Sequence, residues 1–588
     1  MRKKIVRREM PKDQGELANF HPLLQRIYAA RGIHSPDDMS RELVDLLPFD
    51  TLKGIDKAAA RLADAIEQQQ KIIIIGDFDA DGATSTALAV SGMREMGAQW
   101  VDFIVPNRFE YGYGLTPEIV DVANTKSPDL IITVDNGISS IAGVNRANDY
   151  GIDVVVTDHH LSPEVLPLAA AIVNPNQPGD LFESKCIAGV GVIFYVMLAL
   201  RAELKKREWF TKNNIKQPNM ANYLDLVALG TVADVVQLDK NNRTLVYQGM
   251  RRIRAGHTRP GIMALLDIAR RAHHSLVASD LGYAIGPRLN AAGRLDDMSL
   301  GINCLLSDDY KKALQIAQQL DQLNHERRAL EIQMRDEAFD YVEQLEFDNE
   351  LPMGVCVYNP KWHQGIVGLV ASRVKEKLHL PVIAFAQEND DLIKGSARSV
   401  KGLHIRDTLD AIATQNPHLI SKFGGHAMAA GLSIKLADLD EFKQAFAKQV
   451  TISLGKERLE RLVESDGKLD VGDFTLEIAE LLRDSGPWGQ GFPDPTFDGY
   501  FLITEQRLVG EKHLKLTLQV PGCQFFVDAI AFNVDLDVWP NQRCKNIYTA
   551  YRLDVNEYRG RRKLQIVVEH LEPAEVKAKA RAHREIHA

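Results

Sequence analysis

Short apolar runs alternate with amphipathic stretches of helical length through the first third of the chain. The runs are rich in β-branched residues, each ends in turn residues, and they occupy residues 71–77, 101–106, 129–137, 152–160 and 170–175. Strands of this type that alternate with helices form a parallel sheet with helices on both faces. The pattern therefore predicts an α/β domain in which polar residues just beyond the strand ends face the ligand-binding crevice.

The middle of the chain shows two further patterns. Apolar residues recur close to helical spacing in the charge-rich stretch 307–347, which predicts one or two long helices that link two lobes. The polar run at 323–328 within it is expected to face solvent. A second, smaller α/β unit is expected to begin at Met353, to continue through a helix at 365–378 and to end near Val450.

The two ends of the chain have different patterns. Residues up to about Lys57 are predicted to be helical and loop-like, and the charged stretch 455–470 is predicted to be a helical linker. From about 495 to 572, five aromatic-containing segments alternate apolar and polar positions, as the strands of a small barrel do. A five-stranded barrel of the OB type is a common platform for single-stranded nucleic acid.

Composition narrows the class of protein. A chain of 588 residues is too long for one hydrophobic core, so two to four domains are expected. The formal net charge of -9 argues against a protein that coats duplex DNA, although local charge decides whether nucleic acid binds. The five scattered cysteines form no CxxC pair, which argues against a disulfide framework or structural zinc and for a reducing compartment. No apolar run resembles a secretion signal or a membrane span, so a cytoplasmic protein that does not contact membranes is expected.

Acidic and histidine side chains follow three of the predicted strands, and a further acid lies where a predicted helix meets a loop. They are Asp77, Asp79 and Asp81 in GDFDADG, Asp135 in DNG, Asp158, His159 and His160 in TDHH, and Asp234 in GTVADVV. Gathered at one sheet edge, these acids would repel one another strongly without cations. Oxygen-rich ligation with one or two imidazoles suits Mn²⁺ or Mg²⁺, and two such ions can activate water and clamp a phosphoryl group.

Each of these motifs alone also has an ordinary structural explanation. The DxDxDG run is similar to a calcium loop, but an EF-hand needs a glutamate where this chain has Leu88. A lone aspartate after a strand commonly caps a helix, and a DHH triplet can form a polar turn. Three such motifs, each after its own parallel strand, favour a metal site.

The same motifs carry a family resemblance. GDFDADG, VDNG, TDHH and GTVADVV follow the order of the four phosphoesterase motifs of the DHH family, which the chain resembles over about residues 60–450. FGGHAMAAG resembles the GGH motif of the DHHA1 domain that accompanies it, and GPRLNAAGRLDD resembles the RecJ branch of the family. The resemblance implies five parts: an N-terminal helical segment 1–59, a DHH domain 60–306, a connecting long helix 307–350, a DHHA1 domain 351–452 and an OB-like domain 453–578.

The resemblance also implies roles for the clustered side chains. The metal ligands would be Asp79, Asp81, Asp135, His159 and Asp234, with Asp135 bridging two ions. Asp77 would ligate a metal or position its water, Asp158 would orient a histidine, and His160 would contact the scissile phosphate or the leaving group.

A second group of residues is expected to bind phosphate. By resemblance Gly424, Gly425 and His426 would contact the substrate backbone, and a pocket for a terminal phosphate would contain Arg108, Arg288, Ser396 and Arg398. The competing explanations are an ordinary glycine turn and solvated arginines. His363, before a predicted helix, and Arg373 are weaker candidates.

Two other motifs have weaker signals. The basic turn with Arg559, Arg561, Arg562 and Lys563 is expected to lie near Tyr548, Tyr551 and Tyr558, a combination that suits a single nucleic-acid strand. The GVGV at 189–192 lacks the third glycine of a dinucleotide loop and is expected to serve close helix packing.

The function that the resemblance implies is a single-strand-specific 5′-to-3′ DNA exonuclease that releases nucleoside 5′-monophosphates in recombination and repair. Single-stranded DNA, a single-strand-binding protein and a helicase would be its partners, and the protein would be a monomer. Two alternatives stay open on the residues alone: another DHH chemistry, on oligoribonucleotides, cyclic dinucleotides or pyrophosphate, and a non-catalytic DNA-binding scaffold.

Overall fold

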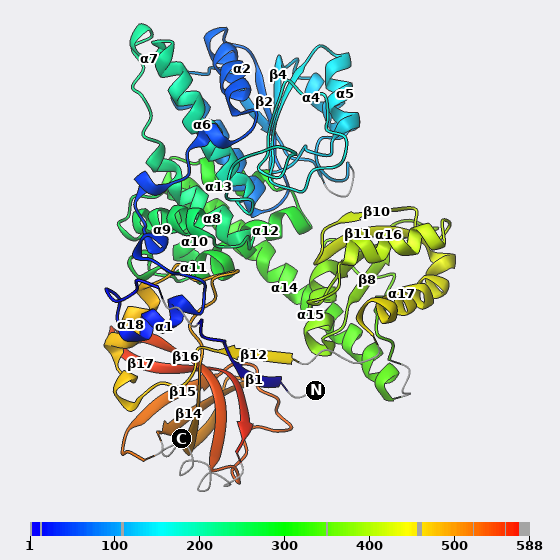
Figure 1. The fold of residues 1–588 in the computed structure, drawn as a ribbon. Helices are drawn as coiled ribbons and strands as arrows, with labels where there is room; N and C mark the ends of the chain where they lie inside the picture. The colour runs from blue at the N-terminus through cyan, green and yellow to red at the C-terminus, as the bar shows by residue number, and fades with distance from the viewer. Residues whose placement is uncertain are drawn as a thin grey trace. The chain divides into compact units, whose positions relative to one another are not determined.

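The protein is described by a computed structural model that covers residues 3–11, 15–107, 111–347, 351–455, 461–520, 522–558 and 560–574 (Figure 1). The chain divides into two compact units. The first contains Met1–Pro287, Ile302–Leu314 and Leu462–Ala588, and the second contains Arg288–Gly301 and Gln315–Arg461.

The first unit is built on an all-parallel five-stranded sheet in the order β3-β2-β4-β5-β6. Its strands are β2 (Ile72–Ile75), β3 (Val101–Ile104), β4 (Leu130–Val134), β5 (Asp153–Thr157) and β6 (Ala171–Val173). Every residue of β2 and β4 is buried, as expected when helices cover both faces of a sheet. The predicted parallel α/β domain is confirmed.

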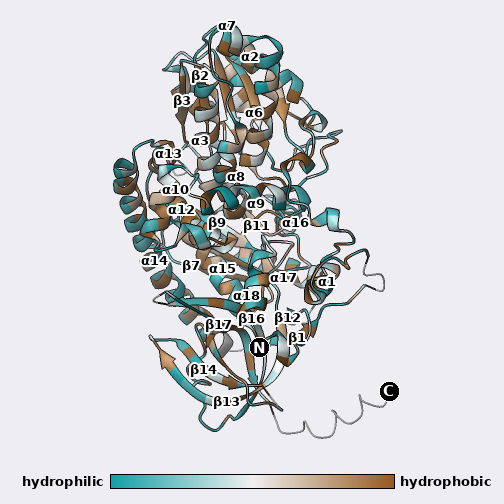
Figure 2. Ribbon diagram, turned by 90° about the vertical axis from the view of Figure 1, so that its left-hand side faces the viewer, coloured by the Kyte–Doolittle hydropathy of each residue, from teal (hydrophilic) through white to brown (hydrophobic). Residues whose placement is uncertain are grey.

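Helices cover both faces of this sheet (Figure 1). On one face, α4 (Pro117–Asn124) and α5 (Ile141–Asp149) pack against alternate residues of β2, β4 and β5. Helix α3 (Ala80–Glu95) contacts β2, β3 and β4, and helix α6 (Gly189–Lys206) contacts β4 and β5. Helix α2 (Ile55–Glu67) packs on α6. Figure 2 shows hydrophobic residues along β2 and α6, in keeping with their burial.

Further helices follow α6 along the chain. They are α7 (Trp209–Lys212), α8 (Leu224–Ala233), α9 (Lys240–Arg254), α10 (Pro260–Ile268), α11 (Ala278–Asp280), the π-turn η6 (Leu281–Ile285), α12 (Gly286–Leu295), α13 (Ser299–Leu306) and α14 (Tyr310–Phe347). Helix α14 is one continuous helix of 38 residues, which confirms the predicted long helix.

The expected solvent-facing run at 323–328 in α14 is wrong for two of its residues. Asn324 is fully buried and Arg327 nearly so, and Arg327 donates to Asn324 Oδ1 over 2.7 Å and pairs with Glu331. A polar sequence can line a buried helix face when its members satisfy one another, so the polar pattern alone was misleading.

The second unit contains a mixed five-stranded sheet in the order β10-β11-β9-β8-β7. Its strands are β7 (Val355–Tyr358), β8 (Val382–Gln387), β9 (Leu392–Arg398), β10 (Lys422–Gly425) and β11 (Ala429–Lys435); only the pairing of β7 with β8 is parallel. Helix α15 (Val367–Leu378) and part of α14 pack on one face, while α16 (Ile405–Gln415) and α17 (Leu439–Leu454) pack on the other. The second α/β unit is confirmed.

The C-terminal strands form a closed barrel in the order β13-β14-β15-β17-β16, which confirms the predicted five-stranded barrel (Figure 1). The strands are β13 (Phe497–Val509), β14 (His513–Gln519), β15 (Phe526–Ala531), β16 (Asn546–Tyr558) and β17 (Arg561–Pro573), and α18 (Leu476–Asp484) packs against β16 and β17.

The expected aromatic and basic cluster in the barrel is wrong for two of its tyrosines. Tyr548 and Tyr551 lie near the start of β16, whereas the basic turn follows its end, where Tyr558 pairs with Arg561. Tyr551 is a core residue, and Tyr548 donates a hydrogen bond to Asp498 over 2.8 Å. Because a strand rises about 3.3 Å per residue, residues close in sequence are separated along it. Arg559 lies outside the described residues.

Two segments that were predicted to be helical contain strands instead. The segment predicted as helical begins with a strand, β1 (Lys3–Arg7), followed by α1 (Pro22–Ala29) and short 3-10 turns. Within the predicted helical linker 455–470, residues 461–465 form a strand, β12 (Arg461–Ser465), that pairs with β1, and none of its described residues beyond β12 is helical. Alternating burial along RLVES, rather than its charge, matches a strand.

The structure also bears on the cysteines and on membrane-spanning segments. All five cysteines are free, and the sequence predicted no disulfide framework. Among the described residues, no helix combines the length and apolar character needed to cross a membrane.

Candidate metal centre

The first acidic motif lies directly after β2, where the chain turns into α3. Asp79 caps this helix, since its carboxylate accepts hydrogen bonds from the backbone of Asp81 (2.9 Å) and Gly82 (3.0 Å). The ordinary capping role that a lone aspartate has after a strand is therefore real here, and it fixes the position of the carboxylate. Asp77 and Asp81 are almost completely buried beside it.

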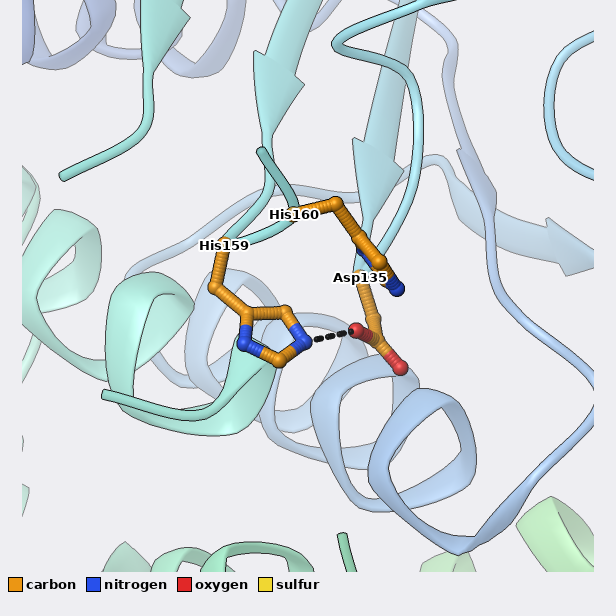
Figure 3. A group of neighbouring side chains, drawn as sticks. All are labelled: Asp135, His159 and His160. Atoms are coloured by element: carbon orange, nitrogen blue, oxygen red, sulfur yellow. Dashed lines mark ion pairs between the residues drawn. The ribbon is translucent and has the colours of Figure 1, made fainter. Parts of the chain in front are cut away.

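Asp135 follows β4 in a left-handed backbone conformation with φ of +63°, which is uncommon for a residue with a side chain. Its side chain meets His159, which comes from the loop after β5 (Figure 3). His159 Nε2 lies 3.1 Å from Asp135 Oδ1 and 3.6 Å from Asp234 Oδ2, and Asp234 caps the end of α8 as predicted.

The predicted acids and histidines converge into three overlapping groups. In each group, one ligand atom per residue lies within 4.8 Å of the others: Asp135, His159 and His160; Asp81, His159 and Asp234; and Asp77, Asp79 and Asp135. Because Asp135 and His159 each belong to two groups, the side chains can hold more than one cation in adjacent positions. The structure thus brings together seven of the predicted residues.

The remaining predicted residue, Asp158 of the TDHH motif, contacts the imidazole ring of His160. Its Oδ1 lies 2.7 Å from His160 Nδ1, and its Oδ2 accepts a hydrogen bond from Ile138 over 2.9 Å. Although burial acts against ionisation, the His160 imidazolium lowers the pKa of Asp158 to about 2. In return the Asp158 carboxylate outweighs burial and raises the pKa of His160 to about 9. The predicted orienting contact between Asp158 and a histidine is present.

The cluster is electrostatically unfavourable without bound cations. Burial, and then neighbouring carboxylates, raise the pKa of Asp81 to about 7 and hold the pKa values of Asp135 and Asp234 well above the usual range. Moreover, the buried Oδ1 of Asp135 accepts no hydrogen bond from any described group. A buried carboxylate oxygen that accepts no hydrogen bond and lies 3.1 Å from His159 Nε2, among other acids, fits a hard divalent cation.

The structure adds residues that the sequence did not single out. The first turn of α6, predicted only to serve helix packing, donates two backbone hydrogen bonds to Asp81, from Gly189 (2.7 Å) and Val190 (3.0 Å). A Cβ at Gly189 would lie 2.7 Å from the Cβ of Asp135, so only glycine fits there. Tyr113 is a third such residue, because its hydroxyl lies 3.2 Å from His160 Nε2.

In the second unit, two of the predicted phosphate-binding residues lie side by side on β9. A Cβ at Gly368, in the first turn of α15, would lie 2.8 Å from Arg398 Nη2 and 3.5 Å from Ser396 Oγ. A guanidinium and a hydroxyl therefore lie beside the first turn of a 12-residue helix. Helix N-termini and arginine both attract anions, so these groups form a plausible phosphate site.

The GGH motif ends the outer strand of the same sheet. Gly431 of β11 pairs with Gly424 on one side and with Ser396 on the other, which puts these residues in one row across three strands. A Cβ at Gly424 would meet nothing within 4 Å, whereas Gly425 has φ of +140° and its Cβ would lie 2.5 Å from Ala429 O. Gly425 is thus required by the turn, while Gly424 leaves an open surface before His426.

The other candidate arginines differ in their surroundings. Arg288 forms an ion pair with Asp321, with Nη2 2.9 Å from Oδ1. Arg373 pairs with Glu331 at 2.8 Å, and His363 Nδ1 accepts a hydrogen bond from Gly365 over 3.1 Å. Arg108 lies outside the described residues.

Three parts of the chain match known domain families. Residues 71–231 match the DHH family, N-terminal domain; residues 352–451 match the DHHA1 domain; and residues 465–570 match the RecJ OB domain.

Individual relatives extend this similarity over nearly the whole chain. The chain is 52% identical to the single-stranded-DNA-specific exonuclease RecJ of Escherichia coli (strain K12) over 570 residues, which cover 97% of this chain and 99% of that protein. It is also similar to crystal structures of RecJ from Thermus thermophilus in complex with Mn²⁺ (TM-score 0.77, 29% identity) and with Mg²⁺ (TM-score 0.73, 27% identity). Each match covers 96% of this chain, with 79% and 78% of the respective structures.

Proposed function

The chain belongs to the RecJ family of single-stranded-DNA-specific exonucleases, and from this premise we infer that it is a metal-dependent exonuclease with the same specificity. We propose that it degrades single-stranded DNA from the 5′ end and releases nucleoside 5′-monophosphates. The observation that carries the proposal is the cluster of six aspartates and two histidines that three strand ends and one helix end bring together. The alternative of a non-catalytic scaffold does not explain why such a cluster is retained.

The cluster is a site for Mn²⁺ or Mg²⁺, the ions present in the similar RecJ structures. We propose that Asp79, Asp81, Asp135, His159 and Asp234 would hold the ions. Asp135 would be the shared residue, because it belongs to two of the groups and its carboxylate has two oxygens that can bind metal. When bound, the two ions would activate water and neutralise charge on the phosphodiester. The backbone of α6 would keep Asp81 in place through its two hydrogen bonds.

The neighbouring residues act on the substrate and on protons. His160, held in its charged form by Asp158, would donate a hydrogen bond from Nε2 to a phosphate oxygen or to the leaving group. Tyr113, next to that nitrogen, would restrict its orientation. Asp77, whose Oδ1 accepts the backbone N–H of Phe78, would position the attacking water.

We propose that the phosphate-binding residues of the second unit contact the same DNA strand. Ser396 and Arg398 would hold the terminal 5′ phosphate, Gly424, Gly425 and His426 would contact the backbone, and Arg288 and Arg108 would add positive charge. A pocket that selects a 5′ phosphate would explain why degradation begins at the 5′ end.

The last part of the proposal concerns the barrel, the partner proteins and the cellular process. We propose that the barrel guides the incoming strand, that a single-strand-binding protein and a helicase present the substrate, and that the enzyme works as a cytoplasmic monomer in recombination and repair. The closed barrel provides the platform on which this part of the proposal rests.

The test uses single-stranded DNA labelled at either the 5′ or the 3′ end, with Mn²⁺, Mg²⁺ or a chelator. We expect metal-dependent release of labelled mononucleotide from the 5′ label first, and none from blunt duplex DNA. Asp135→Asn should be inactive, whereas Asp153→Asn should behave like the wild type, because Asp153 lies exposed at the opposite end of β5. Release from the 3′ label first would overturn the proposed polarity, and binding without hydrolysis would overturn the proposed activity.

A further inference from the structure

One exposed aromatic side chain in the first unit has no role in the chemistry described so far. Tyr283 is 80% exposed, although its neighbours Leu281, Ala284 and Ile285 are buried. It lies in the π-turn η6, between α11 and α12. A π-turn adds a residue to a helical turn, and such turns are frequently found at functional sites. Here the buried neighbours fix the backbone while the ring projects outward.

The π-turn is packed against the helix that carries a metal-site residue. A Cβ at Gly282 would lie 3.3 Å from Val232 Cγ1, and one at Gly286 would lie 3.2 Å from Ala233 Cβ. Val232 and Ala233 are the last residues of α8, and Asp234 follows them as its cap. The two glycines thus let the backbone that carries Tyr283 approach the end of α8, next to the metal cluster.

Tyr283 also lines a groove of about 1550 Å³ within the first unit. Arg254, Arg270 and Arg271 line the groove with it, and strands β16 and β17 of the barrel contribute the facing residues. An exposed aromatic ring among arginines is the combination that binds a single strand, by base stacking and phosphate contact.

Six acidic side chains line this groove, and four of them pair with arginines, whereas Asp554 and Glu557 lie on the barrel side. Asp494 and Glu569 both pair with Arg552, at 3.4 Å and 2.6 Å, and Asp280 pairs with Arg271 at 3.3 Å. Arg254 donates through Nε to Leu276 O, a neutral acceptor, and so keeps its charge uncompensated by that contact. The part of the groove between residues 247 and 284, which includes Tyr283, carries three arginines and one aspartate, and this balance of charge suits a polyanion.

We propose that Tyr283 is a base-stacking residue for the single strand between the barrel and the metal centre. This inference rests on the proposed function. The ring stacks on a nucleobase of the substrate, and the nearby arginines contact the adjoining phosphates. Tyr283 is therefore a positioning residue: it determines how tightly and in which register long strands are held, and takes no part in bond cleavage.

The first test measures the binding of a 5′-phosphorylated oligonucleotide to the full-length protein in the presence of a chelator. Because stacking on one aromatic ring changes affinity by about 5- to 100-fold, Tyr283→Ala should raise Kd by such a factor, whereas Tyr283→Trp should stay within about twofold of wild type. Tyr341→Ala removes an exposed tyrosine of α14, 42% exposed against 80% for Tyr283, and should leave Kd unchanged. Unchanged thermal unfolding of Tyr283→Ala would exclude a folding defect.

A second binding experiment identifies the nucleobase that stacks on Tyr283. A single abasic position is moved along the oligonucleotide, and one position should weaken wild-type binding by the same factor as Tyr283→Ala. That position should have no further effect in Tyr283→Ala, because the stacking partner is already gone. If every abasic position weakened both proteins equally, or if Tyr283→Trp lost as much affinity as Tyr283→Ala, the stacking role would be wrong.

Kinetics with Mn²⁺ separate this inference from the proposed function. Tyr283→Ala should raise KM for long strands and leave kcat unchanged, with little effect on a dinucleotide. If the wild type releases nucleotides and Tyr283→Ala matches it in KM and Kd, only the stacking inference fails. If the wild type hydrolyses no DNA, the proposed function fails, while the binding and abasic arms still decide the role of Tyr283.

Discussion

The two five-stranded sheets carry opposite kinds of chemistry. At the edge of the all-parallel sheet, three strand ends and one helix end bring acids and histidines into overlapping groups of three, and the ligand atoms within each group lie within 4.8 Å of one another. The mixed sheet instead presents Ser396, Arg398 and an open glycine surface at Gly424. The first arrangement repels phosphate until cations bind, and the second attracts phosphate directly.

Under the proposed function, the two sheets would act on one substrate in different ways. Cations and acids are suited to act on the bond that is broken, because they concentrate charge and activate water. Backbone, hydroxyl and guanidinium groups are suited to hold a phosphate that does not react, because they bind it without changing it. The division would be wrong if changes in the two sheets had the same consequences.

The largest effect is expected from Asp135 in the parallel sheet. Asp135→Asn removes charge from two of the three ligand groups while keeping the size of the side chain, and should lower kcat by roughly 1,000-fold or more. The measurement is the rate of mononucleotide release at saturating single-stranded DNA. Asp153→Asn serves as the matched control, and a rise in KM without a fall in kcat would show that Asp135 holds substrate rather than metal.

The next prediction concerns stability and has a defined dependence on pH. In the metal-free protein the raised pKa of Asp81, about 7, means that the folded state binds a proton more tightly than the unfolded state. The associated stability is present below about pH 4, the unfolded pKa, and is lost as the pH rises through about 7. Metal-free protein should therefore become less stable from pH 5 to pH 8.

Mn²⁺ should reverse this loss. At a concentration of about 100 times its Kd, a ligand stabilises the folded state by about 2.7 kcal/mol, and the rise in Tm should be larger at pH 8 than at pH 5.5 because protons compete for the ligands. Thermal unfolding with and without Mn²⁺ measures both effects. Arg398→Ala should show the same rise in Tm as wild type, while Asp135→Asn should show a much smaller one.

The acid cluster could be predicted from sequence because parallel topology is a strong constraint. Once each motif follows its own parallel strand, Asp77, Asp135 and His159 must meet at one edge, whatever the side-chain details. The hydrogen bonds from Gly189 and Val190 to Asp81 could not be predicted, because they join residues 108 and 109 positions apart through a helix end. Likewise, the polar run in α14 gave no sign that Asn324 would be buried.

A smaller effect is expected from the mixed sheet. Arg398→Ala should raise KM for 5′-phosphorylated DNA by about 10- to 100-fold with little change in kcat, since a bidentate arginine contact to phosphate is a charge-assisted one. The same variant should lose most of its preference for a 5′ phosphate over a 5′ hydroxyl. Arg373→Ala is the control, because Glu331 and Glu376 already engage that arginine. Equal losses with both DNA ends would place Arg398 outside the terminal-phosphate site.

The smallest effect separates two adjacent glycines of β10. Gly425→Ala should destabilise the protein by about 1–3 kcal/mol, because φ of +140° is strained for alanine and the Cβ would lie 2.5 Å from Ala429 O. Gly424→Ala meets nothing within 4 Å and should leave the free energy of unfolding nearly unchanged. If a phosphate approaches the backbone there, Gly424→Ala should nevertheless raise KM severalfold. Denaturant unfolding beside steady-state kinetics tests both glycines, and an unchanged KM in Gly424→Ala would mean that the open surface beside Ser396 is not used by the substrate.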